Sequence, residues 1–350
     1  MEIHNPMYIF QLPTLCKYGI NCTNNNCNYT HPLGKYSQQN NKYDYYLGKQ
    51  NILFKTYNIM KNKYNNQITL QCFSNNFYNF NFEQLLETKY YGLNHNIVPN
   101  PYFLMKNALV INHGAERLGG GVLSKGFVQE EIKTMVSTLL GAFIACHGWK
   151  NLVSPMKNSL INEPFIVRME QFADITNLYG TTGILSAVDP NVVEQNIKSL
   201  DEPVQFDWLC MAFQKLKYTD GREYSYELLI QMFITTYKAF TVGIQNAISD
   251  NNGEINILIG NIGCGAFNHC VNVTYSIVIL GLYCAITQIG KNANIYYCTY
   301  DQEIYKELHS DLGAVNFMNS CKDRFSVKDI IIKILDKIKK NNKWREKFIY

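Results

Sequence analysis

Short apolar runs of strand length occur along the chain from residue 68 onwards. They cover residues 68–73, 108–112, 165–169, 255–259 and 295–300. Each run is bounded by polar or glycine-containing segments, which is typical of buried β-strands. The pattern therefore predicts several strands separated by longer connections.

Other segments carry apolar residues at helical spacing. Residues 226–239 and 50–64 are predicted to be helices. Ser326 and Asp329 form a capping pair before a further helix. The clearest helical stripe consists of Ile132, Met135, Val136, Leu139, Leu140, Phe143 and Ile144. Strands that alternate with helices predict an α/β fold, with a sheet flanked by helices.

Composition supports a folded intracellular protein. Hydrophobic residues make up 47% of the 350 residues and charged residues 17%, and the formal net charge is +4. The most apolar segment, residues 271–289, is interrupted by Thr274, Ser276 and Gly281 and is interpreted as a buried helix. Residues 1–12 do not resemble a secretory leader, and the 11 cysteines are not spaced as a disulfide framework. We expect a cytoplasmic or nuclear monomer without a membrane partner.

Three regions differ in composition. Residues 1–32 carry a Cys/His cluster, residues 33–44 form a polar linker, and residues 45–350 form the main α/β domain. The cluster consists of Cys16, Cys22, Cys27 and His31, in the arrangement Cys-x5-Cys-x4-Cys-x3-His. Three thiolates and one imidazole suit tetrahedral Zn²⁺, which would supply most of the folding energy of so short a segment. Chance clustering of cysteines in a tail is the alternative.

The cluster resembles the CCCH zinc-finger family over residues 16–32. Such fingers usually bind single-stranded RNA through aromatic and basic side chains. Here Tyr18, Tyr29 and Lys17 have the required chemistry. The resemblance implies a structural Zn²⁺ and a weak or auxiliary contact with nucleic acid or a related polymer.

A glycine-rich segment leads into the striped helix. Its glycines are Gly119, Gly120 and Gly121, and it ends in Gln129, Glu130 and Glu131. Glycines allow the backbone to approach a ligand closely, and successive N–H groups in such loops bind anions. Adjacent helical residues point about 100° apart. The two carboxylates therefore cannot flank a glycosidic bond as separate acid and base, and a purely structural role in the first helical turn stays open.

A second glycine segment, residues 260–267, follows a predicted strand and precedes a helix. A strand, a glycine loop and a helix N-terminus can form a phosphate site without lysine. An ordinary tight turn is the alternative for Gly263 and Gly265, and Phe267 and Tyr300 would then be core aromatics.

Residues 119–131 look like the signature of poly(ADP-ribose) glycohydrolases, a branch of the macrodomain fold. Residues 260–267 are similar to the diphosphate-binding loop of that family, and residues 295–300 fit a third block. The likeness runs from about residue 50 to residue 340. It implies a macrodomain-like core at about 105–340, with a mixed sheet flanked by helices.

The resemblance also implies roles for individual residues. Glu131 would protonate the leaving ribose 2′-oxygen and then activate water, while Glu130 would hold ribose hydroxyls. No metal would be needed for catalysis. The implied substrate contacts are Gly119, Gly120, Gly121, Gln129, Tyr179, Gly263, Cys264, Gly265, Ala266, Phe267 and Tyr300. The expected partners are poly(ADP-ribose) and ADP-ribosylated proteins, with single-stranded RNA as a partner of the finger.

Two departures from the family pattern are visible. Ala115 stands four residues before the first glycine, where the family usually has an asparagine that contacts the ribose. Asn112 or His113 could replace it from a shifted loop, although a core or surface role is the alternative for His113. Ile262 replaces the family's loop aromatic. Two alternatives to a hydrolase stay open: a non-catalytic module that binds ADP-ribose ends, and an RNA-binding zinc-finger protein.

Overall fold

The computed structural model describes residues 3–4, 7–11, 67–75, 81–100, 102, 104–113, 129–137, 164–175, 177, 195–249, 253–265 and 267–346. Within them, nine strands form one sheet in the order β1-β3-β6-β7-β5-β8-β9-β4, with β2 paired to β3. The strands are β1 (Ile3–His4), β2 (Met7–Gln11), β3 (Gln67–Asn75), β4 (Asn96–Val98), β5 (Ala108–His113), β6 (Phe165–Asp174), β7 (Lys198–Met211), β8 (Ile255–Gly260) and β9 (Ala293–Cys298).

The sheet is mixed. Strands β4, β9, β8, β5 and β7 are parallel to one another. Strands β6, β3, β1 and β2 continue the sheet with antiparallel pairing. The carboxyl ends of the five parallel strands therefore meet at one edge, where α/β proteins place their ligands.

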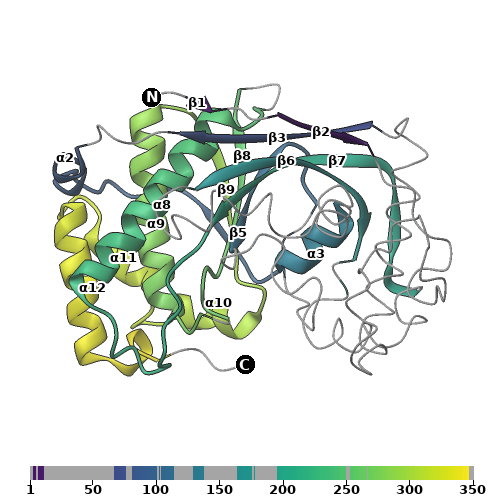
Figure 1. The fold of residues 1–350 in the computed structure, drawn as a ribbon. Coiled ribbons are helices and arrows are strands. Elements are labelled where there is room, and N and C mark those ends of the chain that lie inside the picture. Colours follow the sequence, from purple (N-terminus) through teal and green to yellow (C-terminus); the bar gives the residue numbers. More distant parts are fainter. Residues whose placement is uncertain are drawn as a thin grey trace.

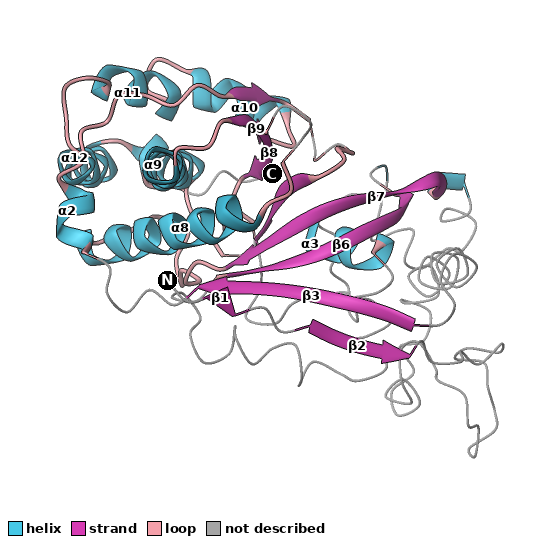
Figure 2. Ribbon diagram, turned by 90° about the horizontal axis from the view of Figure 1, so that it is seen from above, coloured by secondary structure: helices cyan, strands magenta, loops and turns pink. Residues whose placement is uncertain are grey.

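Most described helices form one layer beside the parallel strands. Figure 1 shows α8, α9, α11 and α12 together on one side of β5, and α3 on the other. In Figure 2 the strands β2, β3, β6 and β7 extend away from this helical layer. The helices are α2 (Phe82–Leu86), α3 (Gln129–Val136), α8 (Tyr226–Asn246), α9 (Val271–Ile289), α10 (Gln302–His309), α11 (Ala314–Cys321) and α12 (Val327–Lys340), followed by the 3-10 turn η5 (Asn342–Trp344).

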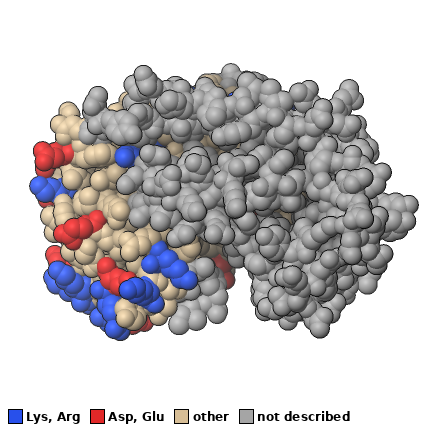
Figure 3. Space-filling model, in the orientation of Figure 1, with Lys and Arg blue, Asp and Glu red and all other residues tan. Residues whose placement is uncertain are grey.

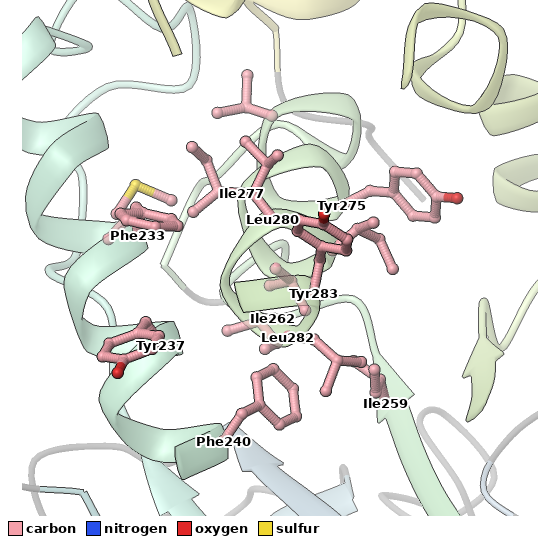
Figure 4. Close-up of a cluster of buried hydrophobic side chains, with 14 of the residues drawn as sticks. Phe233, Tyr237, Phe240, Ile259, Ile262, Tyr275, Ile277, Leu280, Leu282 and Tyr283 are labelled. Carbon is pink, nitrogen blue, oxygen red and sulfur yellow. The ribbon is translucent and has the colours of Figure 1, made fainter. Parts of the chain in front are cut away.

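Helix α9 is the centre of the core. It is long and apolar enough to cross a membrane by length and composition, yet 78% of its most apolar window is buried inside the protein. Figure 4 shows its Ile277, Leu280 and Tyr283 among side chains from α8 and β8, including Phe233 and Ile259. Burial on this scale is the expected environment of an apolar core helix in a globular protein, as predicted for this segment.

Charged side chains lie on the surface of the helical layer. Figure 3 shows a group of Lys and Arg side chains at the lower left, where Figure 1 places α12. Lys337, Lys339 and Lys340 occupy the last turn of α12, where cations interact favourably with the helix dipole. These lysines are thus accounted for by helix electrostatics.

Several predicted elements are confirmed. Strands β3, β5, β6 and β8 each contain a predicted apolar run, and α8 continues beyond the predicted end, to Asn246. The capping box of Ser326 and Asp329 is present at the start of α12. The predicted strand at residues 295–300 was wrong at its end, because β9 stops at Cys298. Tyr300 instead has φ 64, which no strand residue adopts.

Two other predicted helical regions are described only partly or not at all. The stripe after residue 131 is seen as α3, which ends at Val136 within the described residues. The continuation to Ile144 and the helix predicted at residues 50–64 lie outside the described residues.

Candidate active site

The two glutamates lie in the first turn of α3, which follows β5 in the chain. Glu130 is 6% exposed and Glu131 is 4% exposed. Their side chains diverge because neighbours on a helix point about 100° apart. Both carboxyls are therefore largely withdrawn from solvent, whereas most Glu side chains in proteins are exposed.

Glu130 is held by a residue from the sheet. Nδ2 of Asn112 lies 3.4 Å from Oε1 of Glu130 and 3.7 Å from Sγ of Cys210. Asn112 is fully buried, and its Oδ1 has no hydrogen-bond partner among the residues that the structure describes. The backbone carbonyl of Glu130 also accepts a hydrogen bond from Thr134 Oγ1 at 2.7 Å. Asn112 thus fixes the carboxyl of Glu130 relative to β5.

Sequence reasoning named Asn112 only as a substitute for the asparagine missing at residue 115. Its contact with Glu130 was not predicted. The available signal was a single amide at the end of the apolar run of residues 108–112. A buried polar side chain there needs a partner, and the first turn of the following helix supplies one.

A lysine on the same helix is also buried and was missed. Nζ of Lys133 donates to Oε1 of Gln171 at 2.8 Å and lies 5.2 Å from the ring centroid of Phe206. Burial lowers the pKa of Lys133 to about 8, and the nearby Asp174 and Cys298 oppose this shift. The Lys133 ammonium therefore connects α3, the helix that carries the two glutamates, to β6 and β7.

The loop after β8 turns tightly and then opens. Gly263 has φ 70, and a Cβ on it would lie 2.7 Å from Cδ2 of His269. The turn is closed by hydrogen bonds from Cys264 N to Asn261 O at 3.3 Å and from His269 N to Gly263 O at 3.1 Å. Gly265, by contrast, is exposed, and a Cβ on it would meet no described atom within 4 Å. The loop thus presents a bare, side-chain-free backbone at Gly265.

Two other loop residues make contacts with neighbouring segments. Cys264 is buried, with its Sγ 3.1 Å from Oγ1 of Thr274, so a ligand could meet only its backbone. Phe267 is partly buried, and its carbonyl accepts a hydrogen bond from Leu216 N at 3.0 Å. The loop is therefore suited to bind an anion through backbone N–H groups, in the manner of other glycine loops.

A pair of tyrosines connects three parallel strands at this edge. The rings of Tyr102 and Tyr300 lie 5.3 Å apart, and Tyr102 Oη donates to Ile111 O on β5 at 3.3 Å. A Cβ on Gly260, at the end of β8, would lie 2.6 Å from Cε2 of Tyr300. Tyr300 follows β9, so the pair brings the ends of β5, β8 and β9 together. Tyr102 was not predicted, because only the fold places it beside Tyr300.

A hydrogen bond also joins the residue after β8 to the residue after β9. Nδ2 of Asn261 donates to Thr299 O at 2.7 Å, and Oδ1 of Asn261 is buried without a hydrogen-bond partner in the described part of the chain. Tyr300 has φ 64 directly after Thr299. A non-glycine residue in the left-handed region is uncommon and concentrates at ligand sites, which is consistent with the placement of Tyr300 here.

The remaining predicted site residues lie outside the described residues or are seen only as backbone. Gln129 begins α3, and only its backbone is described. Outside the described residues are Cys16, Cys22, Cys27, His31, Gly119, Gly120, Gly121, Tyr179 and Ala266. Among the residues that the structure does describe, no group of three or more His, Cys, Asp or Glu side chains is arranged to hold a metal ion.

Comparison with known proteins identifies the family. The catalytic-domain family described as poly(ADP-ribose) glycohydrolase, macro domain fold, matches residues 103–307, more than half of the 350 residues. The matched segment contains both glutamates, the loop after β8 and Tyr300. A search of curated proteins finds no match.

Solved structures that are similar to this chain include poly(ADP-ribose) glycohydrolases from Thermomonospora curvata and Deinococcus radiodurans. The Thermomonospora curvata protein has 13% identity over 73% of this chain and 94% of its own, with TM-score 0.45. The same protein bound to the inhibitor ADP-HPD has 15% identity over the same shares of both chains, with TM-score 0.45. A Deinococcus radiodurans variant in complex with ADP-ribose has 13% identity over 58% of this chain and 75% of its own, with TM-score 0.37. From the family match across residues 103–307, the chain belongs to the poly(ADP-ribose) glycohydrolase family, which has the macro domain fold.

Proposed function

We propose that this chain hydrolyses the ribose–ribose O-glycosidic bonds of poly(ADP-ribose) and releases ADP-ribose, with Glu131 as general acid and base. As a member of the family, the chain is a poly(ADP-ribose) glycohydrolase. The observation that carries the assignment is the family match, which includes the acidic first turn of α3 and the loop after β8.

In the proposed reaction, one carboxyl carries out both proton transfers. The Glu131 carboxylic acid donates its proton to the leaving ribose 2′-oxygen as the bond from the anomeric carbon to that oxygen breaks. The resulting carboxylate takes a proton from the water that adds to the oxocarbenium-like centre. Glu131 is thereby returned to its acid form.

Glu130 has a positioning role in this proposal. Its carboxyl diverges from that of Glu131 along the helix and is held by Asn112 at 3.4 Å. We propose that it accepts hydrogen bonds from the ribose hydroxyls. Fixing the sugar in this way keeps the reacting bond near Glu131, which lowers the entropic part of the barrier.

The loop after β8 is proposed to receive the diphosphate. Its exposed Gly265 and the left-handed Gly263 support close approach of a phosphate to the backbone. Phe267 and Tyr300 are proposed to contact the ribose and the terminal nucleotide. Gly119, Gly120, Gly121, Gln129, Ala266 and Tyr179 complete the proposed contacts, on the strength of their positions in the sequence motifs.

The test is release of ADP-ribose from automodified polymer by wild type, Glu131→Gln and Glu303→Gln. Glu303 is the matched control, since it is an exposed glutamate in the first turn of α10. We expect Glu131→Gln to slow release by about 100-fold or more and Glu303→Gln to leave it unchanged. Absence of release by the wild type at high enzyme concentration would refute the hydrolase. Binding of polymer without release would select the non-catalytic reader that Ala115 favours.

We also propose that Cys16, Cys22, Cys27 and His31 bind one structural Zn²⁺. The support is the donor set in the sequence, three thiolates and one imidazole at close spacing. Metal analysis of the purified full chain should find about one Zn²⁺ per molecule. Cys22→Ser should reduce it, and loss of RNA binding in the same variant would assign the finger to single-stranded RNA. An unchanged zinc content in Cys22→Ser would refute this ligand set.

A further inference from the structure

His269 ends the loop after β8 and is fully buried. Both ring nitrogens have partners: Nε2 lies 2.8 Å from Gln214 O, and Nδ1 lies 3.2 Å from Tyr224 Oη. A carbonyl oxygen can only accept, so Nε2 carries the proton and Nδ1 accepts from the tyrosine hydroxyl. The tautomer of His269 is thus determined by its neighbours.

The same tyrosine hydroxyl is held on its other side. Tyr224 Oη accepts a hydrogen bond from the backbone N–H of Cys270 at 2.9 Å. Burial raises the pKa of Tyr224 well above its ordinary value, so the hydroxyl keeps the proton that it donates to His269. Cys270 N–H, Tyr224 Oη, His269 and Gln214 O therefore form one continuous chain of hydrogen bonds with a single direction.

The imidazole of His269 packs against the backbone of the loop. A Cβ on Gly263 would lie 2.7 Å from Cδ2 of His269, so the ring packs directly against the Gly263 backbone. Phe213 packs edge-on against the imidazole, with the ring centroids 5.7 Å apart. The backbone N–H of His269 also donates to Gly263 O at 3.1 Å. The position and shape of the turn at Gly263 therefore depend on where the His269 ring lies.

The buried side of the loop is attached to a neighbouring segment. Leu216 N donates to Phe267 O at 3.0 Å, and Nδ2 of Asn268 donates to Leu216 O at 2.9 Å. The His269 contact with Gln214 O lies two residues away in the same segment. Among the described residues of the loop, Gly265 is the exposed one. The bonds to residues 214–216 thus fix one side of the loop and leave Gly265 open to a ligand.

We propose that His269 and Tyr224 are positioning residues that hold Gly263, Cys264, Gly265 and Phe267 in the conformation that receives the substrate's diphosphate. This inference rests on the proposed function of the loop. A loop already ordered before binding does not pay the conformational entropy of becoming ordered around the ligand. Loss of the hydrogen-bond chain should therefore weaken substrate binding. The chemical step should change little, because Glu131 lies on α3.

His269 is neutral at ordinary pH. Burial lowers its pKa to about 4, while the Gln214 carbonyl and the charge of Glu223 oppose this shift. Tyr224 is the other titratable group in hydrogen-bond contact with the ring. The directions of the hydrogen bonds around His269 are therefore constant from neutral pH to well below pH 6.

The test compares Tyr224→Phe with Tyr283→Phe. Tyr283 on α9 is a matched control, because its hydroxyl accepts from Tyr91 N at 3.2 Å and donates to Lys89 O at 2.9 Å, away from the loop. Both variants lose one donor and one acceptor from a buried tyrosine. The measurements are KM and kcat on poly(ADP-ribose), calorimetric Kd for ADP-ribose, and hydrogen exchange of the amides at 261–268 in the free protein.

We expect Tyr224→Phe to raise KM and the Kd for ADP-ribose by about tenfold, with kcat within about twofold of wild type, and to speed exchange in the loop. Tyr283→Phe should change none of these, even where both variants lose similar thermal stability. Unchanged KM and loop exchange in Tyr224→Phe, or equal effects in both variants, would overturn the positioning role.

Two His269 variants separate the contributions of the hydrogen bonds to Gln214 O and to Tyr224 Oη. His269→Gln can keep a donor toward Gln214 O, and His269→Asn can keep an acceptor toward Tyr224. If both bonds hold the loop, each variant should raise KM less than His269→Ala, and equal effects of all three would count against the role of the bonds. Hydrogen exchange needs no substrate. Faster loop exchange in Tyr224→Phe, together with a wild type that releases no ADP-ribose, would therefore support the ordering of the loop by Tyr224 and refute the proposed hydrolase function.

Discussion

Asn112, near the end of β5, donates a hydrogen bond of 3.4 Å from Nδ2 to Oε1 of Glu130 in the first turn of α3. The bond joins the sheet to the helix that carries both glutamates. Asn112 is fully buried and Glu130 is 6% exposed, so water does not compete freely for either group. The sheet thereby contributes to the position of the Glu130 carboxyl.

Asn112→Ala should therefore reduce catalysis without removing either glutamate. We expect kcat to fall about tenfold, because a buried carboxylate loses a donor and Glu130 is no longer held. Steady-state kinetics on polymer measure the effect. Asn272→Ala is the control, since Nδ2 of buried Asn272 donates to Glu307 Oε1 at 3.1 Å. It should lower stability and spare kcat; a comparable loss of kcat in both variants would argue against a specific role of Asn112.

Gly263→Ala should damage the loop more than the same change at another left-handed glycine. Gly263 has φ 70 and would place its Cβ 2.7 Å from His269, whereas Gly290 has φ 73 and its Cβ would meet no described atom within 4 Å. Both substitutions incur about 1 kcal/mol or more of backbone strain. Only Gly263→Ala also displaces the imidazole, so it should be the less stable variant in denaturant unfolding and should raise KM. Equal unfolding free energies would show that the ring moves aside without cost.

Acid should destabilise the fold through His269. Its pKa is about 4 when folded, against an ordinary value of 6.5. Between these values the unfolded chain binds more protons than the folded one, so the free energy of unfolding falls as pH drops from 6.5 to 4. The loss is about 3 kcal/mol for the full shift. Above pH 6.5 the stability contribution is fully present.

The pH effect is measured by denaturant unfolding at a series of pH values in wild type and His269→Gln. Burial also lowers the pKa of His95, so the wild type alone would combine two groups. The difference between wild type and variant isolates His269. Parallel curves from pH 6.5 to 4 would contradict the prediction.

Lys133 should change the pH dependence of the unfolding free energy in the alkaline range. Burial lowers its pKa from 10.5 to about 8. In that interval the unfolded chain binds more protons, so this lysine contributes increasing stability as pH rises from 8 to 10.5. The gain amounts to about 3 kcal/mol. Lys133→Met should lack it, so the stability difference between wild type and variant should shift in favour of the wild type over this range. A constant difference would mean that Lys133 is solvated when folded.

Much of the local structure could be predicted from the sequence. The apolar runs predict β3, β5, β6 and β8, and the Ser326–Asp329 pair predicts the start of α12. Strand β7 was not predicted, because its first eight residues are not buried and include Asp201, Glu202 and Pro203. Strand β7 is placed in the sheet by its pairing with β6 and β5. The first half of the strand therefore carries no apolar pattern that would predict it from the sequence.

The amino-acid sequence by itself determined the strand and helix patterns, the two glycine segments, and the placement of Glu130 and Glu131 at a helix start. These are local features, set by residues within one or two turns of one another. Only the tertiary structure decided that Asn112 holds Glu130, that Tyr102 packs on Tyr300, and that Tyr224 holds His269. Each of these contacts joins residues from different elements. They form when burial of the apolar faces brings those elements together, because a buried polar group must then find a partner wherever the fold places one.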